Sequence, residues 1–209
     1  MKTLIACAAL ISFGTASYGS TFVFDTDPFA GANALTTPGR QIVGGEPSIA
    51  FDIATDVFAF ERSVFSAVGK QLHVINDTIG NIPATGVNTV VLETFDNDND
   101  PTTPFNAGIA ANLIAAQLTD PQPGFFIYFN SALDLPRLVY STDLSDNTAD
   151  LKVLARLTNL GGQTGRDALA GFSATNFKLV PETPATGTLL FMALGALFLT
   201  PAKLRYRRA

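Results

Sequence analysis

The stretch Phe125-Phe126-Ile127-Tyr128-Phe129 is the most informative guide to the fold of this chain of 209 residues. A strand with these residues is apolar on both faces, which predicts a central strand buried on both sides, or one covered by a helix. An exposed aromatic platform for sugar stacking is the alternative. Burial is favoured, because a monomer rarely exposes so much contiguous apolar surface.

Shorter segments on either side of this run alternate between apolar and polar residues, as half-buried strands do. These segments are Phe22–Phe24, Ile49–Ile53, Val57–Phe60, Leu72–Ile75, Thr89–Glu93, Arg137–Tyr140, Leu151–Leu157 and Phe172–Val180. Turn-forming residues separate them, and Gly161–Arg166 suits a hairpin turn.

One segment, Asn106–Leu118, predicts a helix, because Phe105, Ile109 and Leu113 recur at helical spacing in an Ala-rich stretch. With about eight strands, short turns and one short helix, the sequence predicts a mainly β fold, a single β-sandwich or jelly-roll-like domain. The 17 Phe residues provide the apolar surface that such a core requires.

The N-terminus has the features of a secretory signal peptide. Lys2 precedes an apolar run from Leu4 to Phe13, and small residues follow. The run is too short to span a bilayer of roughly 30 Å. We expect a signal peptide over residues 1–19, with cleavage after Ala16 or after Gly19, and therefore processing by the Sec export machinery and signal peptidase.

The C-terminus has the features of a membrane segment. Residues 185–202 are uncharged, and as a helix they span about 27 Å, enough for a thin bilayer. The basic segment 203–209 stays on the cytoplasmic side by the positive-inside rule. Its cations are Lys203, Arg205, Arg207 and Arg208. The remaining residues, 20–180, form one extracytoplasmic β-rich domain by size.

Val180, Pro181 and Glu182 precede the hydrophobic segment, and Arg205, Arg207 and Arg208 follow it. In this order the last 30 or so residues resemble the PEP-CTERM sorting signal of Gram-negative, exopolysaccharide-producing bacteria, with Thr183 in place of the usual proline and Pro184 one step later. It implies an exosortase-type processing enzyme as a partner. It also implies a protein that is anchored in the inner membrane at least transiently and then placed at the cell surface or outside the cell.

Charge is distributed unevenly along the chain. From Thr21 to Val180 there are 17 acidic and 8 basic side chains, a net charge of −9. This acidic domain, called the body below, argues against nucleic acid as a partner, because nucleic-acid binding requires clustered cations facing phosphates. The single cysteine, Cys7, lies in the signal segment, so the body has no disulfide.

The sharpest polar cluster is Asp96-Asn97-Asp98-Asn99-Asp100. Oxygen ligands at alternate positions suit a hard cation, so Asp96, Asp98 and Asp100 are a candidate Ca²⁺ site. The twelve-residue calcium loop does not fit, because Pro101 and Ala107 stand where Gly and Glu are required. A solvated turn is the alternative interpretation.

No catalytic residues are assigned from the sequence. His73 is the only histidine, no Gly-x-Ser-x-Gly elbow is present, and one histidine without body cysteines does not make a zinc site. We therefore expect a non-enzymatic adhesion or exopolysaccharide-associated surface protein of the cell or its biofilm matrix. The alternatives are a secreted carbohydrate-active hydrolase and a Ca²⁺-dependent lectin-like binder.

Overall fold

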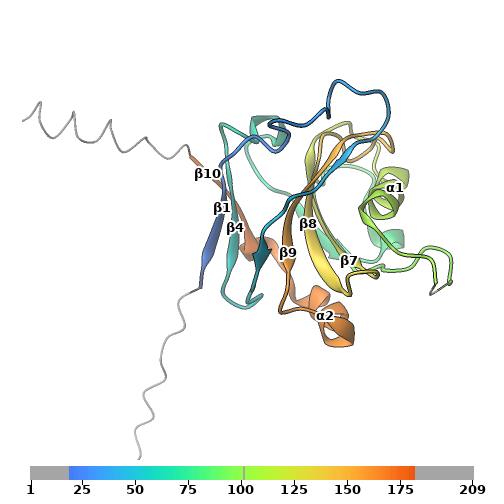
Figure 1. The fold of residues 1–209 in the computed structure, drawn as a ribbon. Coiled ribbons are helices and arrows are strands. Elements are labelled where there is room, and N and C mark those ends of the chain that lie inside the picture. Colours follow the sequence, from blue (N-terminus) through green and yellow to red (C-terminus); the bar gives the residue numbers. More distant parts are fainter. Residues whose placement is uncertain (1–18, 101, 182–209) are drawn as a thin grey trace, which may run out of the picture.

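The computed structural model describes residues 19–100 and 102–181, and within them the chain is mainly β, as predicted (Figure 1). The predicted signal peptide 1–19, except for Gly19, and the predicted membrane segment 185–202 and basic segment 203–209 lie outside these residues. Among the helices in the described ranges, none is long and apolar enough to cross a membrane.

A seven-stranded sheet forms the centre of the molecule. Its strands are β2 (Ile42–Val43), β3 (Ser48–Ile49), β5 (Val74–Asp77), β6 (Thr89–Leu92), β7 (Gly124–Asn130), β8 (Leu135–Ser141) and β9 (Leu151–Leu157). The order is β2-β9-β8-β7-β6-β5, and β3 pairs with β9 further along the same edge. The aromatic run thus occupies a central strand, and all seven residues of β7 are buried.

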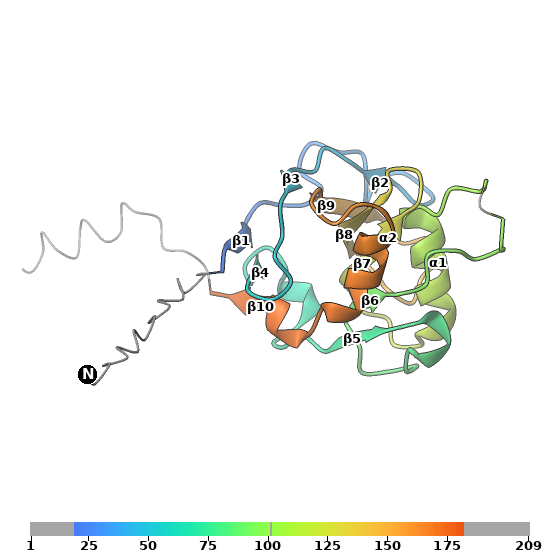
Figure 2. The ribbon, with the colours of Figure 1, turned by 90° about the horizontal axis from the view of Figure 1, so that it is seen from below.

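A second sheet of three strands packs against one face of the first (Figures 1 and 2). Its strands are β1 (Thr21–Phe24), β4 (Val57–Glu61) and β10 (Phe177–Val180), with β4 in the middle. The first and last strands of the described chain therefore form the two edges of one small sheet.

Strand direction differs from what hairpin-based β folds would produce. Of the eight strand pairings among the described residues, six are parallel, and only β7–β8 and β8–β9 are antiparallel. A jelly roll is built from antiparallel strands. Parallel neighbours require crossover connections. The β6–β7 connection contains helix α1 (Ala107–Gln117), and the β5–β6 connection contains the 3-10 turn η2 (Ile79–Asn81).

The core between the two sheets is rich in phenylalanine. Phe51 stacks on Phe58 with ring centroids 4.0 Å apart, and Phe60 stacks on Phe125 at 3.7 Å. Phe60 and Phe125 are distant in the sequence, and all four rings are fully buried. Burial of these rings supplies much of the apolar stabilisation of a body that has no disulfide.

Helix α1 (Ala107–Gln117) covers the other face of the large sheet, in agreement with the predicted helix (Figure 1). Asn106 caps it by accepting a hydrogen bond from the Ile109 amide. The buried face differs from the expected one: Ala107, Ala110, Ala111 and Ile114 are buried, whereas Ile109 and Leu113 are only partly so. Small Ala side chains allow the helix to lie close to the sheet.

Four sequence predictions of local structure need correction. Gly161–Arg166 is largely a second helix, α2 (Gly162–Ala168), rather than a hairpin turn. The expected strand at Phe172–Val180 begins only at Phe177, because Ala174–Asn176 form a 3-10 turn whose Asn176 side chain donates to the Ile53 and Asp56 carbonyls. The segments at Ile49–Ile53 and Leu72–Ile75 contain shorter or shifted strands.

The remaining 3-10 turns connect strands. They are η1 (Ser66–Val68), η2 (Ile79–Asn81) and η3 (Leu169–Gly171), and the turn before β10 is η4 (Ala174–Asn176).

Candidate functional site

The acidic segment that the sequence analysis singled out is an exposed loop between β6 and α1. Asp96 Oδ1 accepts the backbone N–H groups of Asp98 and Asn99, each at 3.0 Å. Asp98 Oδ1 accepts the Asp100 amide at 3.0 Å, and Asp100 Oδ1 accepts both the amide and the hydroxyl of Thr102. One oxygen of each carboxylate thus holds the loop.

Two of the three aspartates line a small cavity of about 210 Å³. The lining residues are Phe95, Asp96, Asp100, Thr103, Ser131 and Arg166. Asp98 belongs to the same loop but not to the cavity. The cavity brings together the loop before α1, the β7–β8 turn and helix α2, three segments that lie far apart in the chain.

Arg166 forms the basic side of this cavity. Its guanidinium lies 4.8 Å from the ring centre of the buried Phe129 and 5.3 Å from that of Phe95, and it pairs with Asp134 at 3.1 Å. Arg166 Nε is buried and has no hydrogen-bond partner among the described residues. The sequence analysis missed Arg166, because only the turn of the chain into α2 places it here.

Phe95 and Asp100 define what the cavity can bind. Phe95 is 39% exposed, and it is the one aromatic residue among the exposed large apolar side chains of the described residues. The hydrogen bonds from Thr102 hold the pKa of the Asp100 carboxyl below its ordinary value, so this group is ionised at neutral pH. Carboxylate oxygens accept hydrogen bonds and the guanidinium donates them. The cavity therefore suits a ligand with several hydroxyls and an apolar face.

The described residues contain no group of three or more His, Cys, Asp or Glu side chains arranged to hold a metal ion. The Ca²⁺ assignment to Asp96, Asp98 and Asp100 stays a prediction.

A second acidic turn, between β8 and β9, is used for structure. Asp150 is buried and accepts the amides of Leu35 and Gln41 at 2.6 Å each. Arg40 donates to three backbone carbonyls, among them that of Asp146. These bonds fasten the long segment before β2 to the turn.

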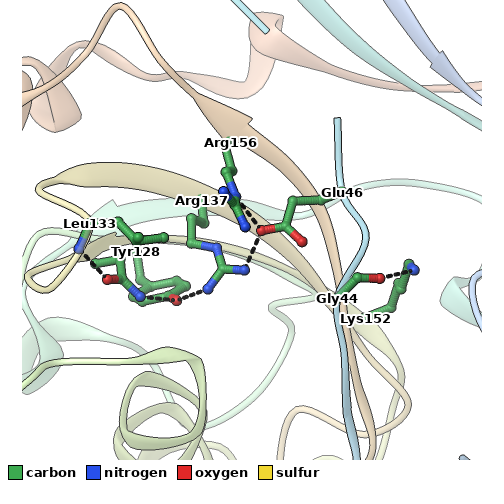
Figure 3. Close-up of polar contacts among 8 residues, drawn as sticks. Gly44, Glu46, Tyr128, Leu133, Arg137, Lys152 and Arg156 are labelled. Atoms are coloured by element: carbon green, nitrogen blue, oxygen red, sulfur yellow. Dashed lines mark hydrogen bonds and ion pairs between the residues drawn. The ribbon is translucent and has the colours of Figure 1, made fainter. Parts of the chain in front are cut away.

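A buried polar network lies on the α1 side of the large sheet (Figure 3). Tyr128, Arg137 and Arg156 are register neighbours on β7, β8 and β9. Two like charges directly opposite destabilise a sheet. Glu46, from the segment between β2 and β3, lies between them: its Oε1 pairs with Arg137 Nη2 and, at 2.6 Å, with Arg156 Nε.

Glu46 is the centre of this network. Its side chain is 1% exposed, and Oε2 has no partner among the described residues. Burial raises the pKa of the Glu46 carboxyl, but the hydrogen bonds from Arg156, the Glu46 backbone and Arg137 outweigh burial, so the pKa lies below its ordinary value. The carboxylate is therefore charged at neutral pH and fastens the β2–β3 segment to the sheet. The sequence analysis assigned no role to Glu46.

His73 lies just before β5 with its side chain exposed. The predicted sorting motif begins at Pro181, which is exposed after β10. Glu182, Thr183, Pro184, Lys203, Arg205, Arg207 and Arg208 lie outside the described residues.

Comparison of the chain with protein-family models, curated proteins and solved structures finds no match in any of the three.

Proposed function

We propose that this chain is an exported, non-enzymatic protein of the cell surface or extracellular matrix, and that its β domain associates with exopolysaccharide. The observation that carries the proposal is the cavity in which the exposed Phe95 ring lies beside the carboxylates of Asp96 and Asp100 and the guanidinium of Arg166.

A sugar ring fits the chemistry of this cavity. Its hydroxyls donate to the carboxylate oxygens of Asp96 and Asp100 and accept from Arg166. Its apolar face packs on Phe95, where the aromatic surface adds contact that a bare polar turn lacks. At about 210 Å³ the cavity is small, which favours one residue of a long polymer over a whole oligosaccharide.

The route to the surface is proposed from the two ends of the sequence. The signal peptide directs export, the segment 185–202 holds the chain in the inner membrane, and an exosortase-type enzyme then processes it near Pro181–Pro184. Replacement of Arg205, Arg207 and Arg208 by Gln is expected to impair retention or processing. Fractionation and gel mobility identical to those of the unmodified protein would contradict the proposed role of the tail.

We also propose that the domain is a variant of the β-sandwich class. The support is the phenylalanine core shared by the two facing sheets and the helix that closes the outer face of the larger one.

The binding proposal is tested with the exported protein purified from cells. The probe is the exopolysaccharide that the same cells produce, and binding is measured by calorimetry with and without Ca²⁺. We expect binding that Phe95→Ala weakens about tenfold, the equivalent of one lost aromatic contact. Leu133→Ala is the matched control, because Leu133 is similarly exposed at 42% and does not line the cavity.

Asp100→Asn and Asp98→Asn provide a second matched pair, since both lie in the acidic loop and only Asp100 lines the cavity. Equal effects of the two substitutions, or no binding by the unmodified protein, would refute the site. Binding that appears only with Ca²⁺ would favour the lectin-like alternative, and release of soluble sugars would favour the hydrolase.

A further inference from the structure

Asp56 is a buried carboxylate directly before β4, and the described residues supply it with no cation. Asp56 is 6% exposed. Among the described residues, Glu46 and Asp134 are the only acidic side chains that form ion pairs. A buried charge without an opposite charge is costly.

The partners of Asp56 are two backbone nitrogen atoms. Oδ2 accepts the Asp52 amide at 2.8 Å, which closes the turn before β4. Oδ1 accepts the nitrogen of Ser20 at 2.5 Å, a contact across 36 residues. Ser20 is also the first residue tied to the sheet, because its carbonyl accepts the Val57 amide at 2.9 Å. The Ser20 nitrogen is thus held against a buried carboxylate, directly before the edge strand β1 of the small sheet.

We propose that signal peptidase cleaves the Gly19–Ser20 bond and that the new α-ammonium group of Ser20 forms an ion pair with Asp56. The inference rests on export, which is part of the proposed function. Sequence rules admit cleavage after Ala16 or after Gly19, because small residues occupy the last and third-last positions of the leader in both cases. Cleavage after Gly19 alone places the new positive charge on the atom that Asp56 contacts.

The chemistry is peptide hydrolysis. One water molecule is consumed, the bond between the Gly19 carbonyl carbon and the Ser20 nitrogen breaks, and Gly19 leaves as the carboxylate end of the released leader. The Ser20 nitrogen becomes an amine and takes up a proton, since an α-amino group titrates at about 7.7–8.0. A single amide donor is thereby replaced by three donors carrying a positive charge, the partner that a buried carboxylate requires.

The geometry also orders the events. In the folded domain the Ser20 nitrogen and carbonyl are both bonded, and an added Cβ on Gly19 would lie 1.8 Å from the Thr55 carbonyl oxygen. The Gly19 side of the scissile bond therefore lies against the turn before β4, although Gly19 and Ser20 are both exposed. We expect cleavage before β1 docks, and the ion pair then secures that strand.

The first test is N-terminal sequencing and intact mass of the exported protein, made from the full-length chain. We expect Ser20 as the first residue, an unchanged start in Ala16→Leu, and a lost or shifted cleavage in Ser17→Leu. An exported protein that begins at Ser17 would overturn this inference and leave the proposed function intact. A chain that stays in the cytoplasm with its leader intact would instead overturn the proposed function.

The second test separates an ion pair from a simple hydrogen bond. Asp56→Asn is measured by urea unfolding in the protein that starts at Ser20 and in the Ser17→Leu chain, where the Ser20 nitrogen is still an amide. We expect Asp56→Asn to change the unfolding equilibrium constant about tenfold more in the first than in the second, because hydrogen bonds to charged groups are stronger. Equal changes in both chains would overturn the ion pair.

Discussion

Replacement of Glu46 by Gln tests whether one buried carboxylate holds the β2–β3 segment on the sheet. Gln keeps the size of the side chain and removes its charge. It leaves Arg137 and Arg156 as unneutralised cross-strand neighbours, with Arg137 14% exposed. The amide nitrogen of Gln also donates hydrogen bonds, and the guanidinium groups around it have no acceptor to receive them.

The expected cost follows from burial. Removing one partner of a buried ion pair costs about 3–5 kcal/mol. The lower end applies here, because the Arg156 side chain is 42% exposed and water screens part of its interaction with Glu46. We therefore expect a loss of about 3 kcal/mol, which in a domain of this size lowers the melting temperature by about 6–12 °C.

The assay is urea unfolding of the exported protein, monitored by circular dichroism, with Glu93→Gln as the control. Glu93 is partly exposed, and the structure gives its side chain no hydrogen bond or ion pair within the described ranges. Glu46→Gln should shift the unfolding midpoint with an unchanged slope, and Glu93→Gln should leave it within experimental error. A loss of less than about 0.5 kcal/mol for Glu46→Gln would refute the role of Glu46 in holding the β2–β3 segment on the sheet.

The Glu46 carboxylate also makes the stability of the protein depend on pH, and stability is expected to fall as the pH falls. The folded-state pKa of Glu46 lies below the ordinary value of about 4.3 that holds in the unfolded chain. The contribution of Glu46 to stability is therefore fully present above about pH 4.3 and is lost as the pH falls through the folded-state pKa. Stability measured from pH 7 to pH 3 should fall less steeply in Glu46→Gln than in the unmodified protein, and parallel curves would contradict this assignment.

Three further predictions concern the fold. Gly124→Ala should destabilise the protein by more than about 2 kcal/mol, because an added Cβ would lie 2.3 Å from the backbone oxygen of Asn88, directly before β6. Gly80→Ala, with no atom within 4 Å of the added Cβ, should be nearly neutral by thermal unfolding. Asn106→Ala removes the cap of α1 and should cost about 1 kcal/mol in the same assay, with Asn106→Asp restoring most of it. Phe60→Ala leaves a cavity in the aromatic core and should cost about 3–5 kcal/mol in urea, and a loss below 1 kcal/mol would show that the core relaxes to fill it.

The sequence by itself determined the features that depend on local pattern. The run Phe125–Phe129 indicated a strand buried on both faces, and β7 has that position. The Ala-rich stretch after Asn106 indicated a helix, and α1 begins and ends within a residue of the predicted bounds. Hydrophobic period and capping are properties of neighbours in the chain, so they can be read without knowledge of the rest of the fold.

Only the tertiary structure decided which of these elements are neighbours. Six parallel pairings, the clamp of Glu46 on two arginines and the cavity joining Asp96, Ser131 and Arg166 all bring together residues far apart in the chain. The sequence does not distinguish a polar side chain that is solvated from one that pairs with a residue of a distant strand. The physical reason is that strand order and direction are chosen by the total burial of the two cores, which no single segment encodes.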